Sequence, residues 1–259
     1  MTEKIKKGFT STAEDFTPLS LEKAWKAAGM QGPPRCTVWL ENTPNEGPFF
    51  VLCKMRPETL LNIKSNLHIF QKKFGDKADL SIQSRLAGNI KKEFSFVPKE
   101  IQSILGEELN ILIRDYSMSF GDKVPKQLGK DYNVATTWVN YQKKYEFNPP
   151  HSHTANLSFV SWISIPYDIK EELSLDNCKH SNKPSNSIFE FIWGSGKKDR
   201  KIRQHPLFIS KEWEGAIVLF DSNLSHTVYP FFTSDGYRIS MSGNLTITGE
   251  SPNFDINYE

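Results

Sequence analysis

The sequence predicts a mainly β fold with N-terminal α/β elements and a jelly-roll core, and three observations lead to this prediction. Of its 259 residues, 38 % are hydrophobic and 24 % are charged, which is typical of a soluble globular protein. Apolar residues recur at helical spacing only before residue 130. After residue 130, short strand-like runs separated by turns take over, and many short strands close most readily into a jelly roll. We therefore expect an N-terminal α/β portion, 1–130, packed on a β core, 131–259, within one structural domain.

The segment before residue 130 reads as a mixture of helices and strands. Ser20 can cap a first helix, which Gly29 would end. Pro98 is well placed to begin the last one. Helices are expected over 21–28, 60–70 and 101–113, and strands over 36–40 and 49–53.

The segment after residue 130 is dominated by apolar runs of strand length. Strands are expected over 134–140, 157–165, 188–193, 216–220 and 237–248. Gly194-Ser-Gly196 is typical of a hairpin turn. The polar stretch 168–187 is expected to be an inserted loop.

Charge and cysteine content bear on the protein's partners and on its cellular compartment. The 32 basic and 30 acidic residues give a net charge of +2, so no nucleic-acid groove is indicated. Three cysteines without a Cys-x-x-Cys pair are typical of reduced thiols in a cytoplasmic protein. We expect no signal peptide, and no run approaches the 18–20 apolar residues of a membrane span.

The histidines are the first candidate functional residues. His151 and His153 are two apart, so on an extended segment both point to one face. An isolated pair of this kind is more often part of an exposed loop, but here Asn148-Pro-Pro150 precedes it and a predicted strand follows. His226 comes directly after another predicted strand. We therefore expect His151, His153 and His226 to hold a metal, and expect surface or structural roles for the remaining histidines, His68, His180 and His205.

Arg238 and Ser240 are the second candidates, and they too share a face. An arginine can bind a carboxylate through two parallel hydrogen bonds, and a nearby serine can add another. An isolated Arg-x-Ser is more often a buried arginine paired with an acidic residue. Its position twelve residues after His226, at the start of an alternating strand, favours a carboxylate-binding role. Asn140, with Trp138, Tyr141 and Trp162, is a candidate pocket residue.

The order His-x-His, distal His, then Arg-x-Ser resembles the iron(II)- and 2-oxoglutarate-dependent oxygenases. Within residues 134–248, the block Phe-Asn-Pro-Pro-His-x-His…Leu-Ser-Phe-Val is similar to the oxygenases encoded by T4-like marine phages. The resemblance implies a double-stranded β-helix (jelly-roll, cupin-like) core and an Fe(II) centre. It also implies 2-oxoglutarate as cosubstrate, held by Arg238, Ser240 and Asn140, and dioxygen as the oxidant. The implied reaction hydroxylates an organic or peptidyl substrate and releases succinate and CO₂, with His151, His153, His226 and Arg238 as the catalytic residues; a phage protein would act in the host cytoplasm.

The expected ligand set departs from the usual pattern of that superfamily, in which a carboxylate stands two residues after the first histidine. If His151 is the first ligand, His153 occupies that position and the site has three histidines, which is the arrangement we favour. If His153 is the first ligand, Ala155 leaves an open position, as in halogenating relatives. Asn156 could then offer only a weak amide oxygen. Acidic residues behind the ligands could be Glu146 or Asp221.

Three alternatives remain open at this point. One is a three-histidine dioxygenase that does not use 2-oxoglutarate, and the second is a halogenase on the same fold. The third is a non-catalytic jelly-roll interaction module. The sequence leaves the substrate and the oligomeric state undetermined.

Overall fold

The computed structural model describes residues 18–38, 49–74, 88–96, 98–120, 131–194 and 202–248. Its helices are α1 (Pro18–Ala27), α2 (Pro57–Phe74), α3 (Pro98–Phe120), α4 (Ile169–Ser174) and the short 3₁₀ helix η5 (Lys211–Trp213). The first seven strands are β1 (Arg35–Val38), β2 (Phe50–Lys54), β3 (Glu93–Phe96), β4 (Tyr132–Gln142), β5 (Asn148–His151), β6 (Leu157–Ser164) and β7 (Phe189–Gly194). The last four are β8 (Ile202–Leu207), β9 (Ala216–Asp221), β10 (Ser225–Val228) and β11 (Arg238–Ile247).

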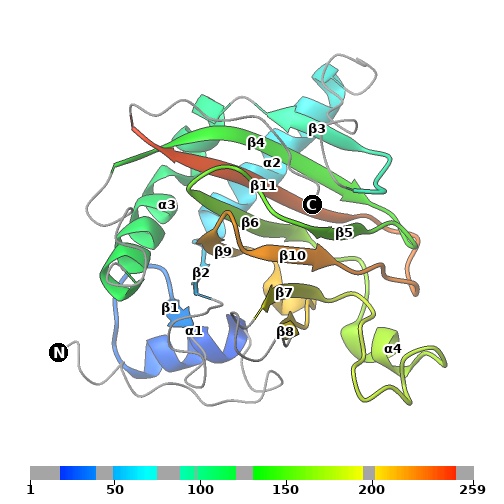
Figure 1. Ribbon diagram of the computed structural model, residues 1–259. Helices are drawn as coiled ribbons and strands as arrows, with labels where there is room; N and C mark the ends of the chain where they lie inside the picture. Colours follow the sequence, from blue (N-terminus) through cyan, green and yellow to red (C-terminus); the bar gives the residue numbers. More distant parts are fainter. Residues whose placement is uncertain are drawn as a thin grey trace.

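The strands form two antiparallel sheets that face each other (Figure 1). The larger sheet has the order β1-β2-β9-β6-β11-β4-β3, and the smaller sheet has the order β5-β10-β7-β8. The eight strands from β4 to β11 divide equally between the sheets, and β1, β2 and β3 extend the edges of the larger one. The fold is mainly β with a jelly-roll core, so the predicted fold class is confirmed.

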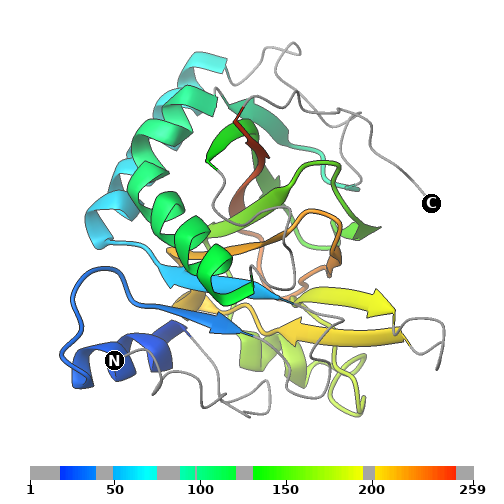
Figure 2. The ribbon, with the colours of Figure 1, turned by 60° about the vertical axis from the view of Figure 1, so that its left-hand side comes forward.

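The larger sheet is covered on both faces, which explains why its strands β6 and β9 are buried along almost their whole length. One face packs on α2 and α3, which lie side by side against it (Figure 2). The other face meets the smaller sheet, and side chains from both sheets fill the space between them. On β6 every residue but the last is buried.

Alternation along β11 divides its side chains between these two environments. Met241 and Leu245 are buried in the core beneath the helices. Ser240 and Ser242 point the other way, into the space between the sheets. Gly243 sits where the backbone of β4 and a ring of β6 come close, since a Cβ there would lie 2.5 Å from Phe159 Cε1 and 2.8 Å from the carbonyl oxygen of Thr136.

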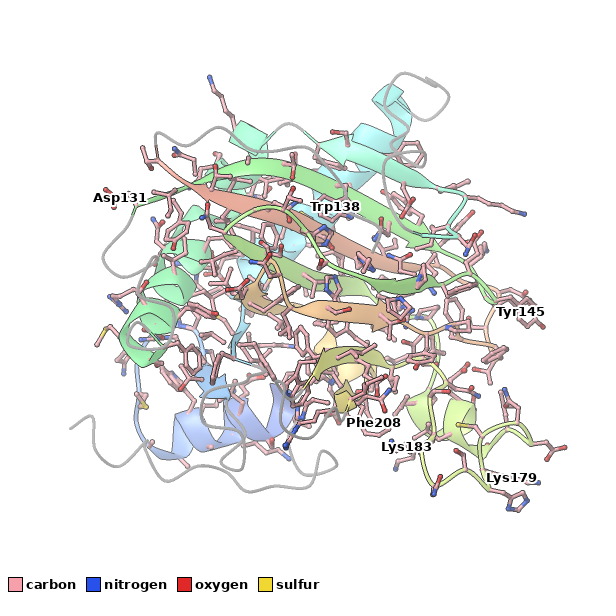
Figure 3. The ribbon with its side chains drawn as sticks, in the orientation of Figure 1. Asp131, Trp138, Tyr145, Lys179, Lys183 and Phe208 are labelled. Atoms are coloured by element: carbon pink, nitrogen blue, oxygen red, sulfur yellow. The ribbon has the colours of Figure 1, made fainter. Side chains whose placement is uncertain are left out.

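The expected helices and the apolar strands all appear, with their ends shifted by a few residues. Four short strands were not anticipated: β3, β5, β8 and β10. The prediction that 168–187 is only a loop was wrong, because it contains α4, whose first turn is capped by Asp168. Figure 3 shows Lys179 and Lys183 of this segment extending away from the sheets. The hairpin turn expected at 194–196 and the proposed boundary at residue 130 fall on or next to residues outside the described part.

His205, which is not part of the histidine cluster, lies on β8. Its ring contacts that of Phe50, with 5.7 Å between centroids. The three cysteines are free thiols, and Cys36 and Cys53 lie on the expected strands. Among the described helices, none combines the length and the apolar composition that a membrane crossing requires.

Candidate metal centre

His151 and His226 face each other across two paired strands. His151 is the last residue of β5, and His226 is its direct partner on β10. Residues directly opposite on an antiparallel pair share a face, and the two imidazole centroids are 4.3 Å apart. The strand pairing itself therefore brings these two side chains together.

His153 joins them from the loop that follows β5. Its backbone N–H donates to the carbonyl of Ser222 at 2.8 Å, which ties this loop to the turn before β10. Its ring centroid lies 5.2 Å from that of His151 and 5.2 Å from that of His226. One nitrogen from each of the three rings lies within 4.8 Å of the others, and imidazole nitrogens bind divalent iron, zinc and copper.

Two of the rings are oriented by backbone carbonyls. His151 Nδ1 lies 2.7 Å from the carbonyl oxygen of Pro149, and His226 Nδ1 lies 3.0 Å from that of Leu224. Because a carbonyl only accepts, each Nδ1 carries the proton and each Nε2 keeps its lone pair. This is the arrangement found behind metal-binding histidines in general.

Burial keeps all three imidazoles neutral. Desolvation lowers the pKa of His151, lowers that of His153 to about 3, and lowers that of His226 well below its usual value. The proximity of the other rings lowers the pKa of His153 and His226 further. Phe189 stacks on His226 with 5.5 Å between centroids. A neutral, desolvated imidazole is the form that coordinates a metal.

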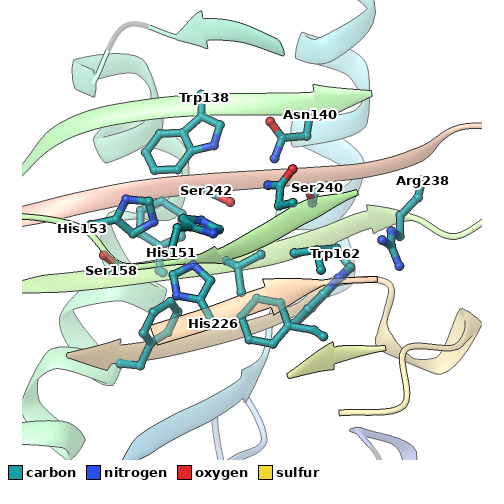
Figure 4. A pocket seen from close by; sticks show the side chains of 16 residues that line it. Trp138, Asn140, His151, His153, Ser158, Trp162, His226, Arg238, Ser240 and Ser242 are labelled. Carbon is teal, nitrogen blue, oxygen red and sulfur yellow. The ribbon is translucent and has the colours of Figure 1, made fainter. Parts of the chain in front are cut away.

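The three histidines stand at one end of a pocket between the sheets (Figure 4). The cavity encloses about 580 Å³, including the solvent at its mouth. Trp138, Asn140 and Ser242 line it from β4 and β11, and Trp162 and Ser158 line it from β6. Arg238 lies at the far end of the pocket from the histidines.

Arg238 is 2 % exposed, and its hydrogen bonds all go to uncharged groups. Nε and Nη2 donate to Gln142 Oε1 at 3.0 and 2.7 Å. Nη1 donates to the Tyr167 hydroxyl and the Ser187 carbonyl, and Nη2 also donates to the carbonyl of Tyr229. None of the ion pairs among the described residues includes Arg238. A buried guanidinium without a counter-ion is costly, so this end of the pocket favours an anion.

The carbonyl of Ser187 reaches Arg238 through an unusual backbone conformation. Ser187 has a φ of 67°, in the left-handed region that residues with a Cβ rarely adopt. Its N–H donates to the carbonyl of Pro230 at 2.8 Å. Such strain persists where the surrounding contacts hold it, and here it turns a carbonyl toward the buried cation.

Several sequence expectations about neighbouring residues need correction. Tyr141 is not a pocket residue, because it points to the helix-covered face, where its ring meets Phe94. Asn156 Oδ1 accepts from the Ile247 N–H at 3.0 Å and is not turned toward the histidines. The carboxylates proposed to lie behind the ligands serve local turns: Glu146 accepts from the N–H of Lys143, and Asp221 from that of Asn223.

The structure brings the other expected site residues together in one pocket. Trp138, Asn140 and Trp162 line the pocket, as do Arg238 and Ser240. The residues that surround Arg238 were missed, because Gln142, Tyr167, Ser187 and Tyr229 come from four separate segments. Asn148, which also lines the pocket, was missed because it precedes two prolines and resembles part of a turn.

Comparison with protein families gives one match. Residues 136–244, which include all three histidines and Arg238, match the family described as "Putative 2OG-Fe(II) oxygenase". This part of the chain is therefore similar to 2-oxoglutarate- and iron(II)-dependent oxygenases. Comparison with curated proteins gave no match.

The chain is also similar to solved structures, among them the three that follow. A prolyl-4-hydroxylase of Pseudomonas putida is 10 % identical, with 81 % of this chain and 97 % of that one covered and a TM-score of 0.47. AviO1 of Streptomyces viridochromogenes Tue57 is 13 % identical, with 82 % and 95 % covered and a TM-score of 0.49. HygX of Streptomyces hygroscopicus, solved with nickel and 2-oxoglutarate bound, is 9 % identical, with 82 % and 86 % covered and a TM-score of 0.48.

Proposed function

We propose that the protein is an iron(II)- and 2-oxoglutarate-dependent oxygenase that hydroxylates an organic substrate, with His151, His153 and His226 as the iron ligands. One observation carries the proposal. A single pocket holds three converging neutral imidazoles at one end and, at the other, a buried arginine without a counter-ion among the described residues. The three imidazoles are suited to bind a metal ion, and the arginine is suited to bind the distal carboxylate of a dicarboxylic acid.

The donor set fits iron(II), for which imidazole is a common ligand. Three neutral ligands leave the full charge of the ion uncompensated, which favours an anionic chelator such as 2-oxoglutarate. With dioxygen, bound iron and 2-oxoglutarate supply the oxidising chemistry: the keto acid becomes succinate and CO₂, and one oxygen atom enters the substrate. The protein's own part is to hold and orient these groups.

Arg238, Ser240 and Asn140 are proposed to hold the distal carboxylate. A carboxylate that replaces Gln142 as the partner of Arg238 exchanges a neutral acceptor for a charged one, and such hydrogen bonds are about twice as strong. Ser240 and Asn140 are direct partners on β11 and β4, so both reach the same part of the pocket. Their hydroxyl and amide can donate to the same group.

Aromatic side chains line the pocket between its two ends. Trp162 packs edge-on against Trp213 and Phe189, and Trp138 lies against His153 with 5.5 Å between centroids. A dry pocket strengthens the electrostatic attraction between the fixed groups and a bound anion. It also protects a reactive oxidant from side reactions.

His153 is the ligand that separates this proposal from halogenation. Its ring lies with the other two, which supports a third imidazole ligand over an open position beside Ala155. The likeness of residues 138–160 to phage-encoded oxygenases, and with it a location in the host cytoplasm, stays a prediction.

Anaerobic titration with Fe(II) tests the metal site. We expect wild type to bind one equivalent and His226→Ala to lose at least tenfold in affinity. His205→Ala removes a partly buried histidine from a strand of the same sheet without touching the cluster, and it should bind iron like wild type. Equal iron binding by wild type and His226→Ala would overturn the metal assignment.

Titration with 2-oxoglutarate tests the role of Arg238. Arg238→Lys keeps the positive charge but removes the guanidinium, which can form two parallel hydrogen bonds with one carboxylate. We expect iron affinity to be unchanged and 2-oxoglutarate affinity to fall about 10- to 100-fold, which corresponds to about 1.4–2.7 kcal/mol. If iron and 2-oxoglutarate affinities fall together, Arg238 has a structural role only and this part of the proposal is wrong.

A further inference from the structure

Glu93 is a fully buried carboxyl group that the proposed chemistry does not use. It is 0 % exposed, and neither of its oxygens has a hydrogen-bond partner among the described residues. Its strand, β3, lies at the edge of the larger sheet, where Glu93 pairs directly with Asn140 of β4. Phe94, the next residue, faces the helices against Tyr141. Glu93 therefore points to the opposite face, the one that Asn140 presents to the pocket.

Asn148 approaches the same point from the other sheet. A Cβ added to Gly88 would lie 2.3 Å from Asn148 Oδ1 and 3.1 Å from Glu93 Oε1. Both oxygens therefore lie next to the Cα of Gly88. A residue with a side chain at this position would collide with them. The N–H of Asn89 donates to the carbonyl of Phe147 at 2.8 Å, which holds this segment against β5.

The three side chains share a chemical feature, because each presents a buried oxygen without a donor. Asn140 and Asn148 are 6 % and 8 % exposed, and the Oδ1 of each lacks a hydrogen-bond partner within the described part of the chain. Both asparagines line the pocket, and Glu93 stands behind them. Buried polar atoms are normally hydrogen-bonded. A wall of acceptors that lacks donors is therefore suited to a ligand that brings several N–H groups.

The carboxyl group adds a preference for positive charge. Burial and the nearby Glu146 raise the pKa of Glu93 to about 7, which shows that its negative form is poorly compensated within the protein. A cation next to the two asparagines would compensate it, and the interaction is strong over a few ångströms in a desolvated site. These three residues also lie close to the proposed metal centre, since Asn140 is two residues from Trp138, which contacts His153.

We infer that Glu93, Asn140 and Asn148 form a recognition site for the cationic nitrogen group of the substrate, a protonated amine or a guanidinium, so that the protein oxidises a basic organic molecule or side chain. The amide oxygens of Asn140 and Asn148 accept its N–H groups, and the carboxylate of Glu93 supplies the opposing charge from behind. The inference rests on the proposed function for its chemistry, but the recognition site itself needs no metal.

Binding to the metal-free full chain tests the inference independently of the iron site. The probes are n-butylguanidinium and n-butylurea, which have nearly the same shape and differ in charge, together with n-butylammonium. Calorimetric titration at pH 8, where Glu93 is mostly ionised, should show at least tenfold tighter binding of one or both cations than of butylurea. The two cationic arms distinguish a guanidinium substrate from an amine.

The variants identify the residue responsible. Glu93→Gln keeps the volume of the protonated acid, and it should reduce the preference for cations to less than threefold while butylurea binding is unchanged. Glu190→Gln makes the same change on β7, where the carboxylate accepts from Gln204 and Tyr229, and it should behave like wild type. Asn148→Ala, checked for folding by circular dichroism, should weaken the binding of the cations in the same way.

Two results would overturn the inference. One is equal binding of butylurea and the cations by wild type, and the other is an unchanged preference in Glu93→Gln. Because no arm contains iron or 2-oxoglutarate, failure here leaves the oxygenase proposal standing. Conversely, loss of the iron site in His226→Ala should leave the preference for cations intact.

Discussion

At the scale of single residues, the pocket concentrates groups that are costly to bury. Three imidazoles are neutral, and within the described residues Arg238 has no counter-ion and the two carboxyl oxygens of Glu93 have no partners. Each of these would be better solvated in the unfolded chain. Retaining them in and behind the wall of one cavity costs stability, and sites with such groups are candidates for function because bound ligands compensate the charges.

The carboxyl group of Glu93 should make stability depend on pH in the ligand-free protein. Its folded pKa of about 7 exceeds the ordinary value of 4.5 because of burial. A raised carboxyl pKa means that stability is complete below the unfolded pKa and is lost as pH rises through the folded one. We expect the unfolding free energy of wild type to fall by roughly 2–3 kcal/mol relative to Glu93→Gln between pH 4.5 and pH 7.5.

Urea denaturation of the two proteins at several pH values measures this difference. Because other groups titrate equally in both proteins, only the difference between their curves is informative. Parallel curves over this range would show that Glu93 is not held in its protonated form by burial.

At the scale of elements, β11 is the strand on which the site depends most. It lies between β4 and β6, and it carries Arg238, Ser240 and Ser242 into the pocket. Its register against both neighbours fixes which groups meet: Ser240 lies beside Asn140 on one side and Trp162 on the other. A change that displaces β11 should therefore affect both folding and the end of the pocket that contains Arg238.

Gly243→Ala tests how tightly β11 is held. The added Cβ would lie 2.5 Å from the ring of Phe159 and 2.8 Å from a carbonyl of β4, so we expect a loss of roughly 1–3 kcal/mol. Gly194→Ala is the matched control, because a Cβ there meets nothing within 4 Å among the described residues. Thermal unfolding compares them, and equal melting temperatures would show that β11 can shift without cost.

The short helix α4 supports the same end of the pocket from outside. Glu172 is fully buried, and its carboxylate accepts from the N–H groups of Phe232 and Thr233 and from the Thr233 hydroxyl. These residues belong to the segment that leads into Arg238. The helix thus positions the arginine through one carboxylate.

Glu172→Gln should destabilise the protein by roughly 1–3 kcal/mol, because an amide cannot accept all of these bonds. We also expect faster hydrogen exchange at the Phe232 and Thr233 amides. Glu171→Gln changes the exposed neighbour on the same helix and should alter neither. Unchanged exchange in Glu172→Gln would mean that other contacts hold this segment.

At the scale of the whole molecule, the features that could be predicted from the sequence are those that depend on residues close together in the chain. The apolar runs of β6 and β9 are long enough to identify strands, and the two-residue spacing of His151 and His153 indicated a shared face. The fold class followed from such patterns, and so did the proposal that these histidines share one site. The family likeness joined them into one site.

The parts that were missed depend on contacts between distant segments. β5 contains Pro149 and Pro150, which normally disfavour a strand, but it lies at the edge of its sheet, where a missing N–H is tolerated. β10 has only four residues, too few for a pattern. Glu93 was not recognised because its burial arises from β4 and β5, neither of which is close to it in sequence.

The central claim is that this pocket uses iron and 2-oxoglutarate for oxidation. The most direct measurement is succinate formed from 2-oxoglutarate in air, with Fe(II), by wild type and by His226→Ala, with His205→Ala as the control. We expect succinate from wild type and from His205→Ala, in amounts that match the CO₂ released, and none above background from His226→Ala. Succinate formation that is absent from all three proteins, or equal in all three, would contradict the account.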